Sequence, residues 1–155
     1  MKNIIFGISL LILMIFNFGN CVSVGIGQNE KDEQIIQDYI KKNSLVATRH
    51  TTGFYYVINS EGTGINPRLQ DSIVVNYSGY TANDNVFDAT TAATGPRTFY
   101  LGGMIAGWQF GVPLIKEGGK IKLLLPSSLA YGNAGVGPIA PNSVLIFDIN
   151  LVKIK

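Results

Sequence analysis

The sequence has very few of the residues on which metal and nucleophilic chemistry usually depend. It contains one cysteine, Cys21, and one histidine, His50. A Cys/His metal site needs three or four such ligands, and a single cysteine cannot form an internal disulfide. The sequence also lacks a Gly-x-Ser-x-Gly motif, a phosphate-binding glycine loop and a suggestively spaced carboxylate pair. We therefore expect neither a metal nor a cofactor, and none of the familiar hydrolase or nucleotide sites.

Charge is scarce as well. Charged residues make up 14% of the chain, the formal net charge is +2, and the largest basic group is the pair Lys41 and Lys42. Nucleic-acid-binding domains usually carry a basic patch, so no nucleic-acid partner is expected. The length of 155 residues predicts one domain with accessory segments.

The N-terminus has the pattern of an export signal. Lys2 precedes an apolar run over residues 4–16, which fits a secretory signal and is too short for a transmembrane helix of about 20 residues. The position of Cys21 resembles a bacterial lipoprotein signal, so we expect a signal peptide over residues 1–20 and lipidation at Cys21. Such a protein is exported, periplasmic and anchored in a membrane. Asn20 departs from the usual small residue, and a soluble secreted protein or an uncleaved anchor helix remain alternatives.

Two accessory segments follow the signal. Residues 21–31 are predicted to be a flexible tether, and residues 32–51 a short helix with an extended connector. The helix is expected from Asp32 to Asn43, with Asp32 as its cap and basic residues in its last turn. One apolar stripe contains Ile35, Ile36, Tyr39 and Ile40. A single short helix is marginal alone, so it either docks on the domain or serves as a dimerisation arm through residues 32–43.

Residues 52–155 have the sequence pattern expected of an α+β domain. All 6 prolines and 14 of the 18 glycines lie there, between short alternating runs. These runs predict strands of an antiparallel sheet at residues 54–58, 72–80, 97–101, 120–125 and 143–155. Residues 104–115 have helical spacing instead, and Pro113 limits this helix to about two turns. A sheet with one short helix buries its apolar face against that helix.

Several motifs in this region, in one order, resemble those of a known family. They are Val74-Val75-Asn76-Tyr77-Ser78-Gly79, Asn85-Val86-Phe87-Asp88-Ala89-Thr90, Phe99-Tyr100-Leu101-Gly102, Met104-Ile105-Ala106-Gly107-Trp108, Pro126-Ser127-Ser128-Leu129-Ala130-Tyr131-Gly132 and Ile139 to Asp148. Together they are similar to the FKBP-type peptidyl-prolyl cis-trans isomerases, here in a bacterial lipoprotein form. The resemblance covers residues 52–155.

The resemblance implies a fold and a site. The fold is a twisted antiparallel sheet of about five strands wrapped on one short helix, with a cleft between helix and sheet. The implied catalytic residues are Tyr77, Asp88, Trp108 and Tyr131. The implied substrate-binding residues are Phe87, Phe99, Met104, Ile105, Ile139 and Phe147.

The implied activity is isomerisation of X-Pro peptide bonds in folding exported proteins. It needs no nucleophile, metal or cofactor, because no bond is broken. One departure concerns Arg97, which stands where the family often has a second aromatic residue. Either Arg97 extends outward along its apolar stem, or it changes substrate preference or weakens binding of macrolide ligands. The alternative function is a low-activity binding or chaperone module of the cell envelope.

Overall fold

The computed structural model describes residues 27–155. The predicted signal peptide, Cys21 and residues 22–26 of the predicted tether lie outside the described residues. Among residues 27–155, no helix is both long enough and apolar enough to cross a membrane.

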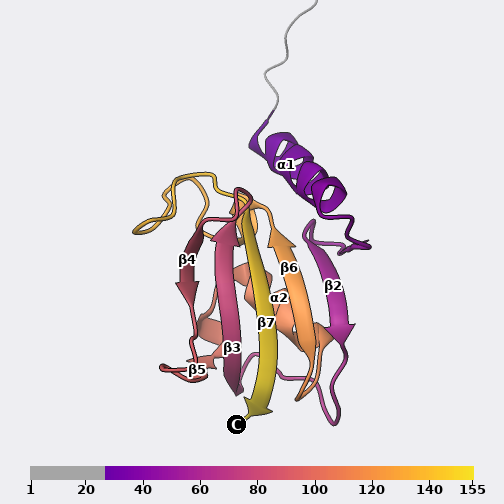
Figure 1. Ribbon diagram of the computed structural model, residues 1–155, viewed down its shortest axis with the longest axis vertical. Helices are drawn as coiled ribbons and strands as arrows, with labels where there is room; N and C mark the ends of the chain where they lie inside the picture. The colour runs from indigo at the N-terminus through magenta and orange to yellow at the C-terminus, as the bar shows by residue number, and fades with distance from the viewer. Residues whose placement is uncertain (1–26) are drawn as a thin grey trace, which may run out of the picture.

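One antiparallel sheet forms the body of the domain (Figure 1). Its strands are β1 (Thr48–Arg49), β2 (Tyr55–Ser60), β3 (Ser72–Thr81), β4 (Val86–Ala89), β5 (Arg97–Tyr100), β6 (Lys120–Leu125) and β7 (Leu145–Ile154). The order is β1-β2-β6-β7-β3-β4, and β5 also pairs with β3. The two ten-residue strands, β3 and β7, are neighbours at the centre of the sheet.

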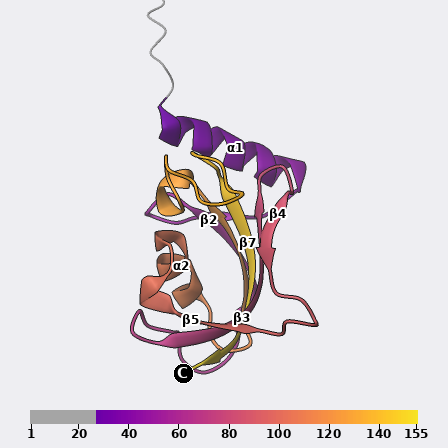
Figure 2. The same ribbon diagram turned by 90° about the vertical axis from the view of Figure 1, so that its left-hand side faces the viewer.

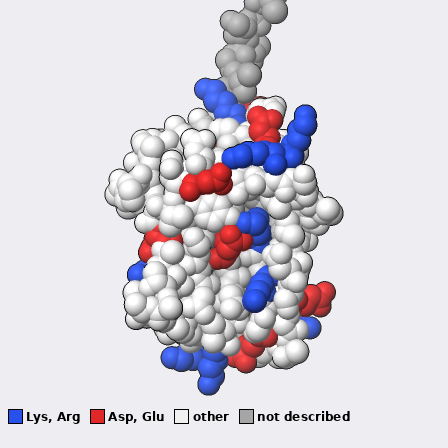
Figure 3. All heavy atoms as spheres, in the orientation of Figure 1, with Lys and Arg blue, Asp and Glu red and all other residues white. Residues whose placement is uncertain are grey.

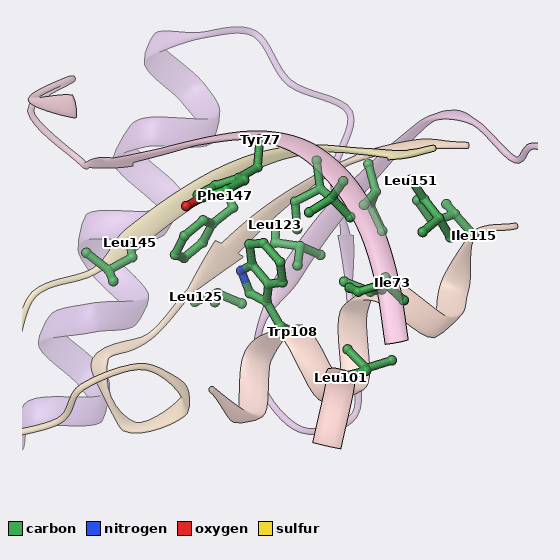
Figure 4. Close-up of a cluster of buried hydrophobic side chains, with 14 of the residues drawn as sticks. Ile73, Tyr77, Leu101, Trp108, Ile115, Leu123, Leu125, Leu145, Phe147 and Leu151 are labelled. Carbon is green, nitrogen blue, oxygen red and sulfur yellow. The ribbon is translucent and has the colours of Figure 1, made fainter. Parts of the chain in front are cut away.

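A short helix covers the inner face of the curved sheet (Figure 2). This helix, α2 (Ala106–Gly111), lies between two 3-10 turns, η1 (Leu101–Gly103) and η2 (Val112–Leu114). Gly107 and Gly111 let it approach the sheet, because a Cβ at either position would lie within 2.6 Å of Leu125 or Leu123 side-chain atoms. The main hydrophobic core lies between α2 and the sheet (Figure 4).

The predicted fold class, an α+β domain with one short helix on an antiparallel sheet, is confirmed. The sheet has seven strands within residues 27–155, not about five. The strands beyond those expected are β1, of two residues, and β4, of four. β1 has too few residues to show a period of two, and in β4 the adjacent apolar residues Val86 and Phe87 interrupt the alternation.

The N-terminal helix is longer than predicted. It is α1 (Gln28–Lys42), its N-cap is Gly27, and no side chain caps it. The prediction that the tether extends to residue 31 and that Asp32 caps the helix is therefore wrong. Asp32 instead lies inside α1 and is fully buried.

The apolar stripe of α1 packs against the domain, which is the first of the two alternatives given for this helix. Ile36 and Tyr39 are buried in a second hydrophobic cluster with Tyr55, Leu124, Val144 and Ile146. At its edge the Tyr55 hydroxyl donates to Glu33 Oε1 over 2.6 Å. The helix thus belongs to the folded unit, and dimerisation through it stays a prediction.

The outer face of the sheet, below α1, carries charges of both signs (Figure 3). At its centre Lys122 forms an ion pair of 2.7 Å with Asp148. The Tyr80 hydroxyl donates to the same carboxylate over 2.7 Å. This face is therefore polar and is covered by α1 only at one end.

Candidate active site

Five aromatic rings form a connected cluster on the inner side of the sheet, here called the aromatic cluster. The Trp108 ring lies 5.4 Å from that of Tyr77, 5.9 Å from Phe99 and 5.5 Å from Phe147. Phe87 joins through Phe147, at 5.7 Å. All four pairs meet edge to face, with interplanar angles of 82–89°, which is a favourable aromatic geometry. Figure 4 shows Trp108 rising from α2 toward Tyr77 and Phe147.

Strand alternation and register bring these rings together. Alternate residues of β3 point inward, so Tyr77 follows the buried Ile73 and Val75 on one face. β5 pairs Phe99 with Ile73, and β7 pairs Phe147 with Gly79.

Gly79 makes room for two of the rings. A Cβ on this residue would lie 2.7 Å from Phe87 Cζ and 2.8 Å from Phe147 Cε1. Carbon atoms in good contact are about 3.5–4.0 Å apart. Only glycine therefore allows both rings to lie against β3 in their present positions.

A polar network borders the aromatic cluster. The Tyr77 hydroxyl donates to Asp88 Oδ2. Arg97 Nη1 donates to the Tyr77 hydroxyl over 3.0 Å and to Asp88 Oδ1 over 3.2 Å. Burial first, and then the hydrogen bond to Asp88, raise the pKa of Tyr77 to about 12. Tyr77 therefore stays a neutral phenol near pH 7 and can orient the Asp88 carboxylate.

Arg97 belongs to the site, but the sequence alone did not indicate which residue it pairs with. Its guanidinium pairs with Asp88, although both side chains remain partly exposed. The sequence does indicate that Arg97 faces the aromatic cluster, because Arg97 and Phe99 are two residues apart on one strand and share a face. Thr90 was missed as well. Its Oγ1 accepts from the Tyr77 N–H over 2.9 Å, and its own N–H donates to the Tyr77 carbonyl over 2.9 Å.

Burial varies across the predicted site residues. Trp108 is 1% exposed and its Nε1 has no hydrogen-bond partner within residues 27–155. Tyr77, Ile139 and Phe147 are also buried in the main core. The half-buried members are Phe87, Asp88, Phe99, Met104 and Ile105. The aromatic cluster is therefore closed around Trp108 and reaches the surface beside the half-buried residues.

Two predicted residues, Tyr131 and Ile105, lie outside the strands of the sheet. Tyr131 follows η3 (Ser127–Leu129), is 37% exposed and forms no aromatic pair within residues 27–155. Ile105 is the N-cap residue of α2, and its carbonyl accepts from the Trp108 N–H over 2.9 Å. The structure thus brings most of the predicted residues together around Trp108, whereas Tyr131 lies on an exposed loop and is not among the side chains packed against the main core.

A groove of about 460 Å³ adjoins the aromatic cluster and is here called the side groove. Phe87 belongs to both. The side groove runs between α1, the turn after β3 and residues 138–144, and none of its lining residues is charged. Ile35 and Val86 supply its exposed apolar side chains.

The arrangement offers an apolar, aromatic surface with one carboxylate at its edge. Within residues 27–155 no group of three or more His, Cys, Asp or Glu side chains could hold a metal ion. The rings of the aromatic cluster offer a surface on which an apolar group can bind and lose its water, beside the Asp88 carboxylate.

The sequence profile of the FKBP-type peptidyl-prolyl cis-trans isomerases matches residues 64–152, which contain every residue of the aromatic cluster. The chain belongs to this family. The family that the sequence motifs suggested is thereby confirmed.

Several similar relatives are FkpA-type proteins. The isomerase FkpA of Escherichia coli strain K12 is 45% identical over 127 residues, which are 82% of this chain and 47% of that protein. A probable FkpA of Neisseria meningitidis is 40% identical over 126 residues, 81% of this chain and 46% of that protein. The chain thus spans about half the length of the curated relatives it matches. The crystal structure of FkpA from Escherichia coli superposes with a TM-score of 0.73 at 38% identity, covering 83% of this chain and 63% of that one.

Proposed function

We propose that the protein is a peptidyl-prolyl cis-trans isomerase that assists the folding of exported proteins. The observation that carries the proposal is the aromatic cluster around Trp108, bordered by the Tyr77–Asp88–Arg97 network. Membership of the FKBP-type family supports the same activity. The substrates would be X-Pro segments of unfolded or partly folded chains.

The chemistry fits the residues because isomerisation breaks no covalent bond. Its barrier of about 18–20 kcal/mol reflects loss of amide resonance as the C–N bond twists. The twisted amide has a smaller dipole than the planar one, so an apolar surface favours it. Exclusion of water also removes hydrogen bonds that stabilise the planar carbonyl. An aromatic surface without a nucleophile is therefore sufficient.

Each site residue receives a role in this proposal. Trp108 contacts the proline ring at the base of the aromatic cluster, and Tyr77, Phe87, Phe99 and Phe147 surround it. Met104, Ile105 and Ile139 complete the apolar contacts. The Tyr131 hydroxyl and the Ile105 N–H hold substrate carbonyls, and Asp88, oriented by Tyr77 and Arg97, faces the twisting amide.

The test is an isomerisation assay on X-Pro peptides with the soluble chain from residue 22 onward, beside Asp88→Ala and Trp108→Leu. The wild-type chain is expected to exceed the spontaneous rate. Both variants are expected to lose most of the catalysis while circular dichroism shows a folded domain. A correctly folded wild-type chain that leaves the rate at its spontaneous value would refute the proposal.

The alternative function is a binding or chaperone module of low isomerase activity. The side groove favours it, because an uncharged groove with exposed Ile35 and Val86 continues from the aromatic cluster and suits an extended apolar chain. Ile35→Asp with Val86→Asp should then abolish suppression of aggregation of a reduced client protein and leave the rate on a short X-Pro peptide unchanged. Val46→Asp is the control, since Val46 is 92% exposed and outside the side groove.

We propose in addition that the chain is exported to the periplasm and anchored in a membrane through acylated Cys21. The support is the position of Cys21 after an apolar run in the sequence. Cys21→Ser should release the protein from the membrane fraction of a bacterial host. Continued membrane association of that variant would refute lipidation there.

Macrolide ligands are proposed to bind weakly at the aromatic cluster. Arg97 puts a cation within 6.0 Å of the Tyr77 ring centroid, at a site where an apolar ligand would need an apolar wall. Arg97→Phe should therefore raise the affinity measured by calorimetry. Unchanged affinity in that variant would contradict the role given to Arg97.

A further inference from the structure

Asp32 is a fully buried carboxylate in a helix that precedes the family match. Its Oδ2 accepts from the Ser127 N–H over 2.8 Å and from Ser127 Oγ over 2.6 Å. Its Oδ1 accepts from Gln28 Nε2 over 2.6 Å. A buried carboxylate is tolerated only when such charge-assisted bonds replace water. The link joins residues that are 95 positions apart in the sequence.

Ser127 connects this carboxylate to the loop that carries Tyr131. The Ser127 carbonyl accepts from the Ala130 N–H over 3.0 Å and from the Gly132 N–H over 2.9 Å. These two amides belong to the residues on either side of Tyr131. Ser127 is also almost fully buried. The N–H, hydroxyl and carbonyl of one residue are thus all engaged, on one side by Asp32 and on the other by the neighbours of Tyr131.

We propose that Asp32 is a positioning residue for the active site, acting through Ser127 to hold Tyr131 in place. This proposal rests on the proposed function, in which the Tyr131 hydroxyl holds a substrate carbonyl. Tyr131 is 37% exposed and forms no aromatic pair within residues 27–155. Its position therefore depends on its backbone, and the Asp32–Ser127 link fixes that backbone.

The docking of α1 does not depend on Asp32 alone. Ile36 and Tyr39 are buried against the sheet, the Tyr55 hydroxyl bonds Glu33, and Lys42 pairs with Asp84 at 3.0 Å. Removal of the Asp32 carboxylate therefore leaves the helix attached, and an effect on Tyr131 can be separated from loss of α1.

The experiment measures kcat/KM for an X-Pro peptide in the wild-type chain, Asp32→Ala, Asp32→Asn, Tyr131→Phe and the Asp32→Ala/Tyr131→Phe double variant. Asp32→Ala should lower kcat/KM about 3- to 10-fold, the range expected when one hydrogen bond to the substrate is lost. In the Tyr131→Phe background the same substitution should have no further effect. A purely structural role would instead lower kcat/KM by the same factor in both backgrounds, and that outcome would overturn the proposal. Asp38→Ala is the matched control, because Asp38 is an exposed carboxylate of α1 whose one side-chain partner among residues 27–155 is Gln34.

A second measurement does not depend on catalysis. The 19F spectrum of the chain labelled with fluorotyrosine, assigned with Tyr131→Phe, should show a shifted or broadened Tyr131 signal in Asp32→Ala and in Asp32→Asn. An unchanged Tyr131 signal in both variants would overturn the positioning role even if the wild-type chain is active. A wild-type chain without activity, in which the Tyr131 signal still responds to Asp32, would refute the proposed function and support the structural link.

Discussion

Gly79→Ala tests whether the close packing of rings on β3 is needed for activity. The added methyl group would lie 2.7 Å from Phe87 Cζ and 2.8 Å from Phe147 Cε1, about 1 Å inside normal carbon contact. Phe147 is buried and meets Trp108 at 5.5 Å, so it has little room to move, and the half-buried Phe87 takes most of the displacement. Such overpacking costs about 1–3 kcal/mol of unfolding free energy.

The displacement also reaches the substrate surface. Misplacement of active-site groups by about 1 Å can lower a rate by up to about 100-fold. We expect kcat/KM for an X-Pro peptide to fall about 10-fold in Gly79→Ala, because one of the five rings moves. Stability is measured by urea unfolding with circular dichroism, and activity by a protease-coupled assay.

Two further variants make the test specific. Gly103→Ala is the control, since its new Cβ would meet nothing closer than Tyr100 Cδ1 at 3.4 Å, and it should change neither quantity much. Phe87→Leu, added to Gly79→Ala, should recover part of the lost stability because the smaller side chain relieves the overlap. A Gly79→Ala variant with wild-type stability and wild-type kcat/KM would refute the reasoning.

Three other predictions concern the same region. Because the pKa of Tyr77 is raised from 10.0 to about 12, its contribution to stability is complete below pH 10 and is lost as the pH rises toward 12. An absorbance titration should show one tyrosine that ionises near pH 12 and is absent in Tyr77→Phe. A midpoint near pH 10 for this tyrosine would contradict the prediction. Arg97→Gln removes a partly exposed ion pair with Asp88 and should cost only about 0.2–1 kcal/mol in urea unfolding; a loss well above that range would mean that the network is more tightly coupled than its exposure indicates. Gly107→Ala places a Cβ 2.3 Å from Leu125 Cδ1 and should cost about 1–3 kcal/mol. Leu125→Val should recover part of that loss, and equal stability of Gly107→Ala and the wild-type chain would argue against close helix packing.

The long and regular elements could be predicted from the sequence because their periodicity is strong. The alternation of β6 gave its bounds, Lys120–Leu125, as the structure has them. The helical spacing after Met104 and the limit set by Pro113 match α2 and the η2 turn. β1 was not predicted because two residues give no periodic signal, and β4 was not predicted because its adjacent apolar residues Val86 and Phe87 interrupt the alternation.

The start of α1 and the role of Asp32 could not be predicted from the neighbouring residues in the sequence. Residues 28–31 are all polar, so no apolar period marks them as helical, and Asp32 has the chemistry of an N-cap. Its true partner, Ser127, lies 95 positions away. Only tertiary packing brings the two residues together, and no pattern within either segment contains that information.

Family motifs predicted the five residues that the structure brings together in the aromatic cluster, but they did not predict the charged groups beside it. Arg97 looked like a missing ring and is a partner of Asp88. That pairing depends on β5 lying beside β3, with Arg97 opposite Val75. Strand alternation puts Arg97 on the same face as Phe99, but which strand lies beside β5 is set by long-range pairing.

The burial of Trp108 also has a spectroscopic consequence. It is the only tryptophan in the chain, and its indole N–H has no hydrogen-bond partner within residues 27–155. An indole shielded from water emits at shorter wavelength than an exposed one. Fluorescence excited at wavelengths that the seven tyrosines do not absorb therefore comes from the centre of the aromatic cluster. Without any label, a shift of this emission to longer wavelength reports that water has reached the core around Trp108.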